Sequence, residues 1–293
     1  MSKTKKLKLG LPKGSLQEST IELFKKAGIR IVSSSRSYFP YCDDEELEIM
    51  LVRSQEMAKY VEQGVFDAGL TGYDWICESG AKVIEIGELV YAKNGFRPVR
   101  WVLAVPENSS IKKIQDLDGK RIATELVNFT TKYFKEKNVN VNVEFSWGAT
   151  EAKTPSLVDG IVELTETGNS LKANKLKIID ELLQSTTRFI ANEDSLKDQW
   201  KIEKIENLML LLKGALAAES LVGLKLNIHK NNLNKVTELL KGLRKPTISP
   251  LQDEAWVAIE VIIDEKELKK LIPHLKKVGA EGIIEYSLNK VIF

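Results

Sequence analysis

Strand-like and helix-like segments alternate along most of this chain, and no other feature of the sequence restricts its fold as strongly. Short apolar runs, typical of buried strands, are separated by segments in which apolar residues recur every three or four positions. The first strand, residues 7–11, precedes a helix at residues 15–27 that Ser15 and Glu18 can cap reciprocally. Such alternation predicts α/β layers.

The pattern continues over the first two-thirds of the chain. Further strands are expected at residues 49–52, 68–70, 83–89, 101–105, 121–124, 141–145, 160–164, 177–183 and 188–191. Further helices are expected at residues 55–63, 130–137, 167–173 and 195–212.

The last block has a different order. Its strands are expected at residues 221–228, 256–263 and 283–291, and its helices at residues 233–243 and 265–278. The proline-bounded segment 246–250 completes a βαββαβ order if it is also a strand. That order predicts a ferredoxin-like sandwich.

Composition excludes several classes of protein. The chain has 293 residues, of which 43% are hydrophobic and 29% charged, as in soluble globular proteins of two or three domains. A net charge of +2 gives no reason to expect nucleic acid or a membrane as a partner. The basic N-terminus runs into Gly10, Pro12 and Lys13, so we expect no signal peptide and a cytoplasmic location.

Two residue types are too scarce for some kinds of site. Cys42 and Cys77 form neither a zinc-like spacing nor a disulfide framework, which fits a reducing compartment. With only two histidines, His229 and His274, a His-rich metal site or a Ser-His-Asp triad has little material.

The most informative stretch is VDGIVELTETGNSL, residues 158–171. It brings an apolar strand to its end and turns through small polar residues into a helix, an arrangement whose exposed N–H groups bind anions. Asp159 and Glu163 are placed to contact ribose hydroxyls or a Mg²⁺ carried by phosphates. The pattern predicts a sugar-phosphate site, and it also fits an ordinary turn with an N-cap threonine.

This stretch resembles the signature that binds phosphoribosyl pyrophosphate (PRPP) in ATP phosphoribosyltransferases, and the preceding WGATEAK resembles the loop that leads into that signature. Other segments resemble that family in the same order along the chain: LGLPKGSL near the N-terminus, GVFDAGLTGYDWI, RIATELVN and KPTISPLQDEAWVAIEVII. By their joint occurrence the chain is identified as a member of the family. It departs from the common pattern at Glu163, often aspartate, and at Asn169 and Ser170, often larger, basic or threonine.

The resemblance implies an α/β fold like that of type II periplasmic binding proteins, in which two lobes enclose a cleft, plus a C-terminal ferredoxin-like (ACT-like) regulatory domain. The first lobe would be discontinuous, with residues 1–98 and 185–213. The second lobe would cover residues 99–184, and the regulatory domain residues 214–293.

The resemblance also implies a reaction. N1 of the ATP adenine would displace pyrophosphate from C1 of PRPP with inversion, as the first step of histidine synthesis. Such a reaction depends on positioning and on cationic groups that hold the leaving pyrophosphate. Mg²⁺ would be held mainly by substrate phosphates, with Asp159 and Glu163 as candidate protein ligands.

Residues that match the family's motifs receive roles from the same resemblance. The catalytic set would be Lys13, Asp159, Glu163 and Arg100. PRPP would be bound by Thr167, Gly168, Asn169, Ser170, Leu171 and Glu151. ATP and its phosphates would contact Gly14, Arg53, Asp67, Thr71 and Gly72. For Arg53 and Arg100, a surface ion pair is the competing interpretation.

The C-terminal block resembles the domain that binds histidine as a feedback inhibitor. The matching positions are Asn227, Leu243, Thr247, Ser249, Ile262 and Gly282. Asn227 replaces an aspartate seen in some relatives, and the lost charge predicts weaker pairing with the ligand ammonium. For Thr247 and Ser249, a proline-stiffened edge strand is the competing interpretation.

The resemblance further implies a homo-oligomer, a dimer or a hexamer, that needs no separate regulatory subunit, with AMP as a further candidate ligand. Two other functions fit part of the pattern. A non-catalytic cytosolic sensor of small molecules would share the fold and leave the phosphoribosyl signature unexplained. A phosphoribosyltransferase that acts on another base would share that signature.

Overall fold

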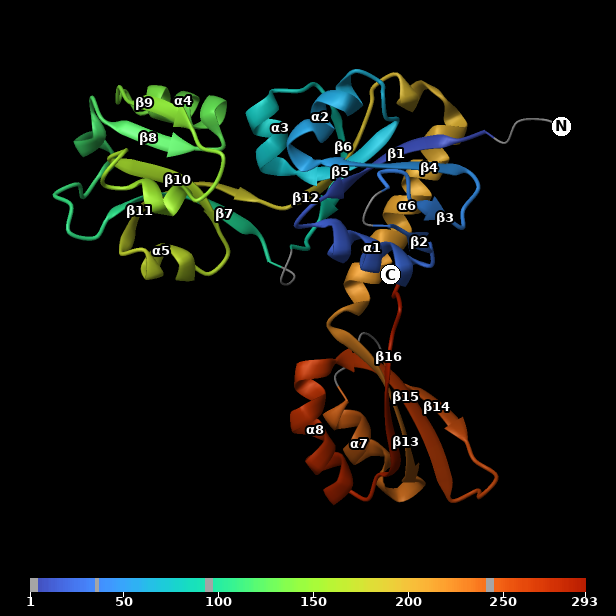
Figure 1. Cartoon of the computed structure of the whole chain (residues 1–293). Coiled ribbons are helices and arrows are strands. Elements are labelled where there is room, and N and C mark those ends of the chain that lie inside the picture. The colour runs from blue at the N-terminus through green and yellow to red at the C-terminus, as the bar shows by residue number, and fades with distance from the viewer. Residues whose placement is uncertain (1–4, 35–36, 93–96, 241–244) are drawn as a thin grey trace. The chain divides into compact units, whose positions relative to one another are not determined.

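The computed structural model describes residues 5–34, 37–92, 97–240 and 245–293. The chain divides into two units (Figure 1). The first unit comprises residues 1–25 and 29–209, and the second unit comprises residues 26–28 and 210–293. Within the described ranges, no helix has the length and apolar character needed to span a membrane.

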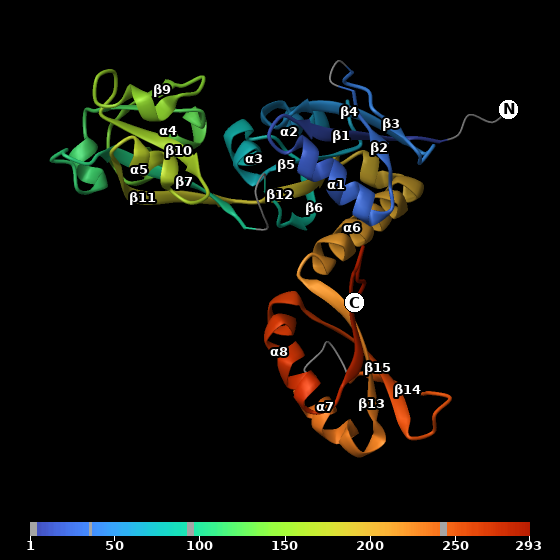
Figure 2. The same ribbon diagram turned by 60° about the horizontal axis from the view of Figure 1, so that its bottom comes forward.

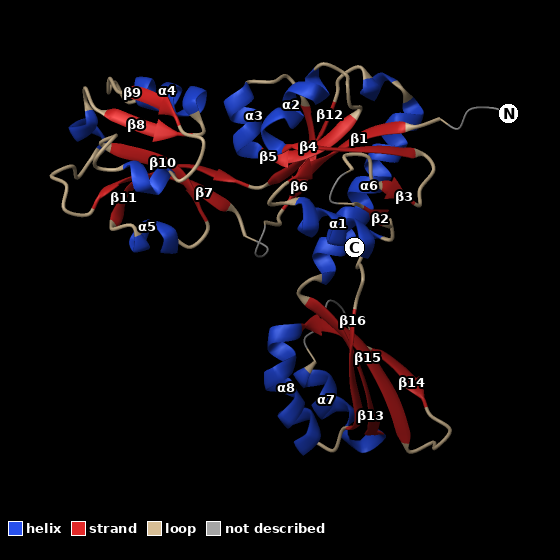
Figure 3. Cartoon of the chain, viewed as in Figure 1, coloured by secondary structure: helices blue, strands red, loops and turns tan. Residues whose placement is uncertain are grey.

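The first unit contains two five-stranded sheets (Figure 3). In the first sheet the strand order is β4-β1-β5-β12-β6. The bounds are Leu47–Arg53 (β4), Leu7–Lys13 (β1), Ala68–Gly72 (β5), Thr187–Ala191 (β12) and Ile84–Leu89 (β6). Strands β4, β1 and β5 are parallel, whereas β12 is antiparallel to its neighbours β5 and β6. A short ribbon pairs β2 (Ile31–Val32) with β3 (Tyr41–Cys42).

Four helices accompany the first sheet, and part of the last one lies in the second unit. They are α1 (Gln17–Ala27), α2 (Ser54–Glu62), α3 (Tyr73–Ser79) and α6 (Gln199–Ala218), which continues into the second unit. Helix α2 packs closely on the sheet because Gly69 has no side chain: a Cβ there would lie 2.7 Å from Met57 Sδ. Since α2 follows β4 without a loop, this packing also fixes Arg53 at the end of β4.

The second sheet has the order β11-β7-β10-β8-β9. The bounds are Leu176–Ser185 (β11), Val99–Pro106 (β7), Gly160–Thr165 (β10), Arg121–Thr124 (β8) and Asn142–Phe145 (β9). Alternate side chains of β7 enter two cores, as period-2 strand geometry requires. Trp101 packs in the core that contains Phe134 of α4 (Val127–Glu136), and Val102 in the core that contains Leu171 of α5 (Asn169–Ala173).

The chain passes from the first sheet to the second after β6 and returns to the first as β12. The first lobe is therefore discontinuous in sequence, and the predicted two-lobed α/β fold class is confirmed. β7 begins at Val99 and β11 ends at Ser185, next to the predicted boundaries at residues 98 and 185. The second unit begins at residue 210 rather than 214. The assignment of these parts as functional domains stays a prediction.

The second unit is the predicted ferredoxin-like sandwich. Its elements are β13 (Leu221–His229), α7 (Leu233–Leu239), β14 (Thr247–Pro250), β15 (Trp256–Asp264), α8 (Glu265–Lys277) and β16 (Glu281–Ser287). The antiparallel sheet has the order β14-β15-β13-β16, and α7 and α8 cover one face of it (Figure 2). Buried Leu224, Leu226 and Ile259 form the core under these helices together with Leu268 and Leu275.

The structure differs from the expected elements mainly where tertiary contacts, rather than local sequence, determine the secondary structure. Helix α3 was not expected, and it is only seven residues long. Helix α5 begins at Asn169 rather than at residue 167, because residues 166–168 form the turn after β10. Short 3₁₀ turns lie at Ile114–Leu117, Thr150–Lys153, Ser195–Lys197 and Lys230–Asn232.

We expect Gly69→Ala to lower the free energy of unfolding by about 1–3 kcal/mol, because its methyl group would overpack Met57. Urea denaturation followed by circular dichroism measures this cost. In a Met57→Ala background the same substitution should cost clearly less, since the obstructing sulfur is gone. An equal cost in both backgrounds would show that close packing under α2 is not the reason for the glycine.

Candidate active site

A cavity of about 270 Å³ lies where the two sheets of the first unit meet. Lys13, Arg53 and Gly72 line one side, and they are the last residues of β1, β4 and β5. Glu125, Glu163 and Glu166 line the other side, at or just beyond the ends of β8 and β10. The carboxyl ends of parallel strands are where open α/β sheets bind ligands, so this cavity is the candidate active site.

Two cations stand on the first-sheet side. Lys13 and Arg53 are register partners on β1 and β4, so their side chains start from neighbouring strands. The Lys13 ammonium lies 4.4 Å from the ring centroid of Tyr38, within cation–π range. Among the described residues neither cation forms a salt bridge. Their charges are therefore available to an anionic ligand.

Gly14, which follows Lys13, has a φ of +112°. That conformation is unfavourable for a residue with a side chain. A Cβ at this position would also lie 3.0 Å from Arg53 Nη1. Gly14 thus lets the chain turn sharply from β1 into α1 beside the two cations.

Carboxylates stand on the opposite side. Burial raises the pKa of Glu163 above its ordinary value, opposed by a hydrogen bond from the Thr150 hydroxyl, and the nearby charges of Glu151 and Glu125 raise it further. Burial also raises the pKa of Glu125, opposed by a hydrogen bond from the side chain of Gln55 on α2. Partly desolvated carboxylates of this kind favour ligands that donate hydrogen bonds or carry positive charge.

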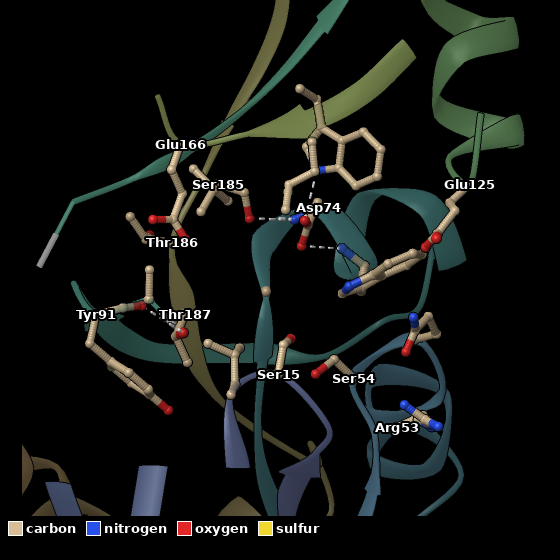
Figure 4. Close-up of a pocket in the computed structure, with 18 of the residues that line it drawn as sticks. Ser15, Arg53, Ser54, Asp74, Tyr91, Glu125, Glu166, Ser185, Thr186 and Thr187 are labelled. Atoms are coloured by element: carbon tan, nitrogen blue, oxygen red, sulfur yellow. Dashed lines mark hydrogen bonds between the residues drawn. The ribbon is translucent and has the colours of Figure 1, made fainter. Parts of the chain in front are cut away.

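Asp74 lies between these two sides (Figure 4). Its Oδ2 accepts a hydrogen bond from Trp101 Nε1 at 2.7 Å, which joins α3 to β7 of the second sheet. Its own N–H donates to Ser185 Oγ at 3.0 Å. The carboxylate is folded back over Gly72 so closely that a Cβ on that glycine would overlap Asp74 Oδ1. Burial raises the pKa of Asp74.

The predicted loop occupies residues 165–171, directly after the strand that carries Glu163. Thr165 Oγ1 accepts the N–H of Gly168 at 2.8 Å, and Leu171 is buried in the core. One of the N–H groups expected to face a ligand is thus already bonded within the loop. Thr167, Asn169 and Ser170 are exposed, and Glu166 of the same turn lines the cavity.

Two predicted site acids lie at the opposite ends of their strands. Asp159 precedes β10, and its Oδ2 accepts the N–H of Arg121 at 2.9 Å. Asp67 precedes β5, and its carboxylate is buried against Ser195 at 2.7 Å and Lys201 at 2.5 Å. Neither is among the described residues that line the cavity. Both carboxylates already have partners that stabilise the fold.

Three other predicted residues lie near the cavity without lining it. Arg100 is the register partner of Thr165, and its guanidinium forms a 3.1 Å ion pair with Glu181. Thr71 is fully buried and donates to the carbonyl of Ser54 at 2.8 Å. Glu151 belongs to the 3₁₀ turn Thr150–Lys153, and its charge helps to raise the pKa of Glu163, which lines the cavity.

Several cavity residues were not singled out from the sequence. They are Gln55, Asp74, Trp75, Tyr91, Trp101 and Glu125. Glu125 had a usable signal, because it directly follows β8 as an acid at the carboxyl end of a parallel strand. Tyr91 had none: its hydroxyl bonds Thr20 at 2.8 Å, and burial raises its pKa to about 12.

The cavity offers hard oxygen donors, which are the ligands that Mg²⁺ prefers. In the described part of the chain, however, no three His, Cys, Asp or Glu side chains converge to hold a metal ion. The residues present therefore fit a Mg²⁺ ion that arrives with phosphates and takes one or two protein carboxylates, rather than a dedicated cage.

The residues predicted to bind an inhibitor gather on the open face of the second unit's sheet. Ser249, Ala258 and Asn227 are register neighbours across β14, β15 and β13. Thr247 and Ile262 lie on the same face by strand alternation, and Gly282 lies beside Asn227 on β16: a Cβ there would be 3.5 Å from Asn227 Nδ2. Leu243 lies outside the described residues.

We expect Asp74→Asn to change how stability depends on pH. The pKa of Asp74 is raised above its ordinary value of 3.8, so the folded state holds this proton more tightly than the unfolded state. Wild-type stability from this group is therefore present below that value and is lost as pH rises through the folded pKa. Asparagine keeps an acceptor for Trp101 and carries no charge.

Urea unfolding measured from about pH 4 to pH 8 should show the variant gaining stability relative to the wild type as pH rises. Asp116→Asn is a control: that exposed carboxyl has a lowered pKa, so its contribution to stability changes mainly below its ordinary value of 3.8, and its curve should run nearly parallel to wild type over this range. Parallel curves for Asp74→Asn and wild type would mean that the carboxyl titrates normally.

Comparison with known proteins agrees with this architecture. Residues 53–214 match the family model described as ATP phosphoribosyltransferase, and residues 218–290 match the model of the HisG C-terminal domain. An ATP phosphoribosyltransferase from Chlorobaculum parvum is 61% identical over 286 residues, covering 98% of this chain and 97% of its own length. One from Thermodesulfovibrio yellowstonii is 60% identical, covering 99% of both chains.

A solved structure shows the same fold over most of the chain. An ATP phosphoribosyltransferase (HisG:HisZ) complex from Thermotoga maritima contains a chain that is 30% identical, with a TM-score of 0.61. The match covers 71% of this chain and 98% of that one. This chain belongs to the ATP phosphoribosyltransferase family, and it has the additional C-terminal domain of the long form.

Proposed function

We propose that the cavity between the two sheets joins N1 of the ATP adenine to C1 of PRPP and releases pyrophosphate, the first step of histidine biosynthesis. The observation that carries this proposal is the opposition of two cations, Lys13 and Arg53, which form no salt bridge with any residue that the structure describes, to the partly desolvated carboxylate of Glu163. PRPP presents complementary groups, because its pyrophosphate is anionic and its ribose hydroxyls donate hydrogen bonds.

Glu163 has the central role in this proposal. It lies two residues before the end of β10, and the loop at residues 165–171 follows directly. Its carboxylate accepts hydrogen bonds from the ribose hydroxyls while Thr167, Asn169 and Ser170 bind the 5′-phosphate. As the bond to pyrophosphate weakens, C1 becomes positive, and a nearby carboxylate stabilises that charge.

The cations act on the leaving group. Lys13 and Arg53 hold the pyrophosphate as negative charge accumulates on it. Because Gly14 has no side chain, it leaves room for the guanidinium of Arg53. A Mg²⁺ ion carried by the substrate phosphates supplies further charge neutralisation when it is bound. Adenine N1 attacks with its own lone pair, so no general base is assigned. Glu125, which lines the cavity, contacts the substrates from the second-sheet side.

The proposal gives no catalytic role to Asp159 or Asp67. Asp159 lies four residues before Glu163, and its carboxylate accepts a hydrogen bond from the N–H of Arg121. At about 3.3 Å per residue, those four residues of extended chain separate the two acids by about 13 Å. Arg100 orients Glu181 and supports β7 against β11.

We expect Glu163→Gln to lower kcat/KM for PRPP by about 100-fold or more, because the charge that stabilises the developing oxocarbenium is lost. Pyrophosphate release and the ultraviolet absorbance of the product, in the presence of ATP, PRPP and Mg²⁺, measure this effect. Ser170→Ala should raise KM for PRPP with a smaller change in kcat.

Asp159→Asn is the matched control on the same strand. It removes a charge but keeps an acceptor for the N–H of Arg121, so kcat/KM should change by no more than about threefold, the scale of a small stability effect. If Glu163→Gln behaved like this control, the assignment of the ribose site would be wrong.

We propose further that the open face of the second unit's sheet binds histidine and that this lowers the activity. Asn227 and Ser249 present polar side chains on this face, with the small Ala258 between them. Because this unit is part of the chain, a homo-oligomer, dimer or hexamer, should be active and inhibited without any second polypeptide. Binding of AMP is part of the same proposal.

Asn227→Leu keeps the volume of the side chain and removes its hydrogen bonds, so we expect the histidine concentration for half-inhibition to rise about tenfold or more. Initial rates at increasing histidine concentration measure this shift in the purified chain alone. Asn234→Ala, on helix α7 at the other face, is the control and should leave inhibition unchanged. Equal inhibition of Asn227→Leu and wild type would place the inhibitor elsewhere.

A further inference from the structure

Helix α3 has contacts with both sheets of the first unit, although it follows β5 of the first sheet directly. Ile76 packs against the first-sheet core that contains Met57 and Phe66. Trp75 packs against the second-sheet core, where its ring meets that of Trp101 at a centroid distance of 6.2 Å and an angle of 86°. One short helix therefore has a side chain in each core.

Glu78 on this helix completes the N-terminus of a helix in the other lobe. Its Oε1 accepts the N–H of Asn128 at 3.0 Å, and its Oε2 accepts the N–H of Phe129 at 2.9 Å. The side-chain amide of Asn128 donates to the Glu78 carbonyl at 3.2 Å. These N–H groups belong to the first turn of α4, which has no partners for them within the helix.

The N-cap residue of helix α4 is Leu126, whose apolar side chain forms no cap hydrogen bond, and the nearby Thr124 hydroxyl accepts only the N–H of Leu126 itself, at 3.1 Å. A carboxylate is the strongest partner for such an end, since it bonds the free N–H groups and complements the helix dipole. The missing cap of α4 is thus supplied by Glu78 of α3, which lies fifty positions before Asn128 in the chain.

The position of this cap matters for the cavity. Glu125, which lines the cavity, is separated from the first residue of α4 only by Leu126, and Leu126 is fully buried. This short and buried connection leaves the backbone of Glu125 little freedom to move relative to the capped turn. Gln55 of α2 lines the same cavity, so the capped helix end and a helix of the first sheet both reach it.

We propose that Glu78 is a positioning residue for catalysis: by capping α4 across the two lobes, it holds Glu125 in the cavity. The proposal rests on the function proposed above, in which Glu125 contacts the substrates. Glu78 itself does not line the cavity and touches no substrate in this scheme. Its effect on the reaction passes through the turn that joins β8 to α4.

Amide hydrogen exchange in the unliganded protein tests the cap without any assay of activity. Glu78→Ala should speed exchange at Asn128 and Phe129 by about tenfold or more, while amides in the second unit stay unchanged. Glu136→Ala removes a carboxylate from the other end of α4, where it only approaches Lys132, and should leave both amides as in wild type. Unchanged exchange in Glu78→Ala would overturn the inference.

A double-mutant cycle tests the link to Glu125. We expect Glu78→Ala and Glu125→Gln each to lower kcat/KM by about tenfold or more, since small displacements of an active-site group are costly. Together they should lower it little further than Glu125→Gln alone, because residues that act in sequence are not additive. Glu78→Gln keeps one of the two acceptor oxygens and replaces the other with an NH2 donor, so it should recover part of the loss.

Fully additive effects would mean that Glu78 acts on stability alone, and the inference would fall. No effect of Glu125→Gln would remove the role of Glu125 and this inference with it. The Glu163→Gln and Asp159→Asn pair would still test the proposed reaction independently.

Discussion

The site depends on strand β12, which lies between β5 and β6 and is antiparallel to both. In the sequence β12 follows all five strands of the second sheet, so the first sheet is completed by a segment far from its other strands along the chain. Both crossings between the sheets pass the cavity: Tyr91, Val99, Ser185 and Thr187 all line it. Long-range pairing of this kind is slow to form, which ties completion of the first sheet to completion of the site.

Electrostatic separation gives this site its character. Lys13 and Arg53 come from one sheet, whereas Glu125 and Glu163 come from the other, so the opposite charges do not neutralise one another in the described structure. Partial burial places the two carboxylates in an environment of reduced polarity and raises the pKa of each. A substrate with an anionic end and a hydroxyl-rich middle satisfies both sides at once, and such groups interact more strongly here than in water.

The sequence was sufficient for the fold class, for the ferredoxin-like C-terminal unit and for the loop at residues 165–171, because each has a strong local pattern. It was not sufficient for helix α3, whose Trp75 and Ile76 face different cores and so break the apolar spacing of a one-sided helix. The acids show a second limit. Asp159 and Glu163 are both carboxylates of one short segment in the sequence, and only the structure shows that Glu163 lines the cavity whereas Asp159, at the other end of β10, bonds the N–H of Arg121.

The close approach of Asp74 to Gly72 has a consequence for how related sequences can diverge. The Asp74 carboxylate occupies the space where any side chain at position 72 would begin, while its other oxygen holds the Trp101 indole. A mutation at position 72 is thus tolerable only after position 74 has become smaller, and that change in turn leaves the indole N–H without its partner. These three positions are therefore coupled, because a side chain at position 72 requires a change at position 74, and that change removes the partner of the Trp101 indole.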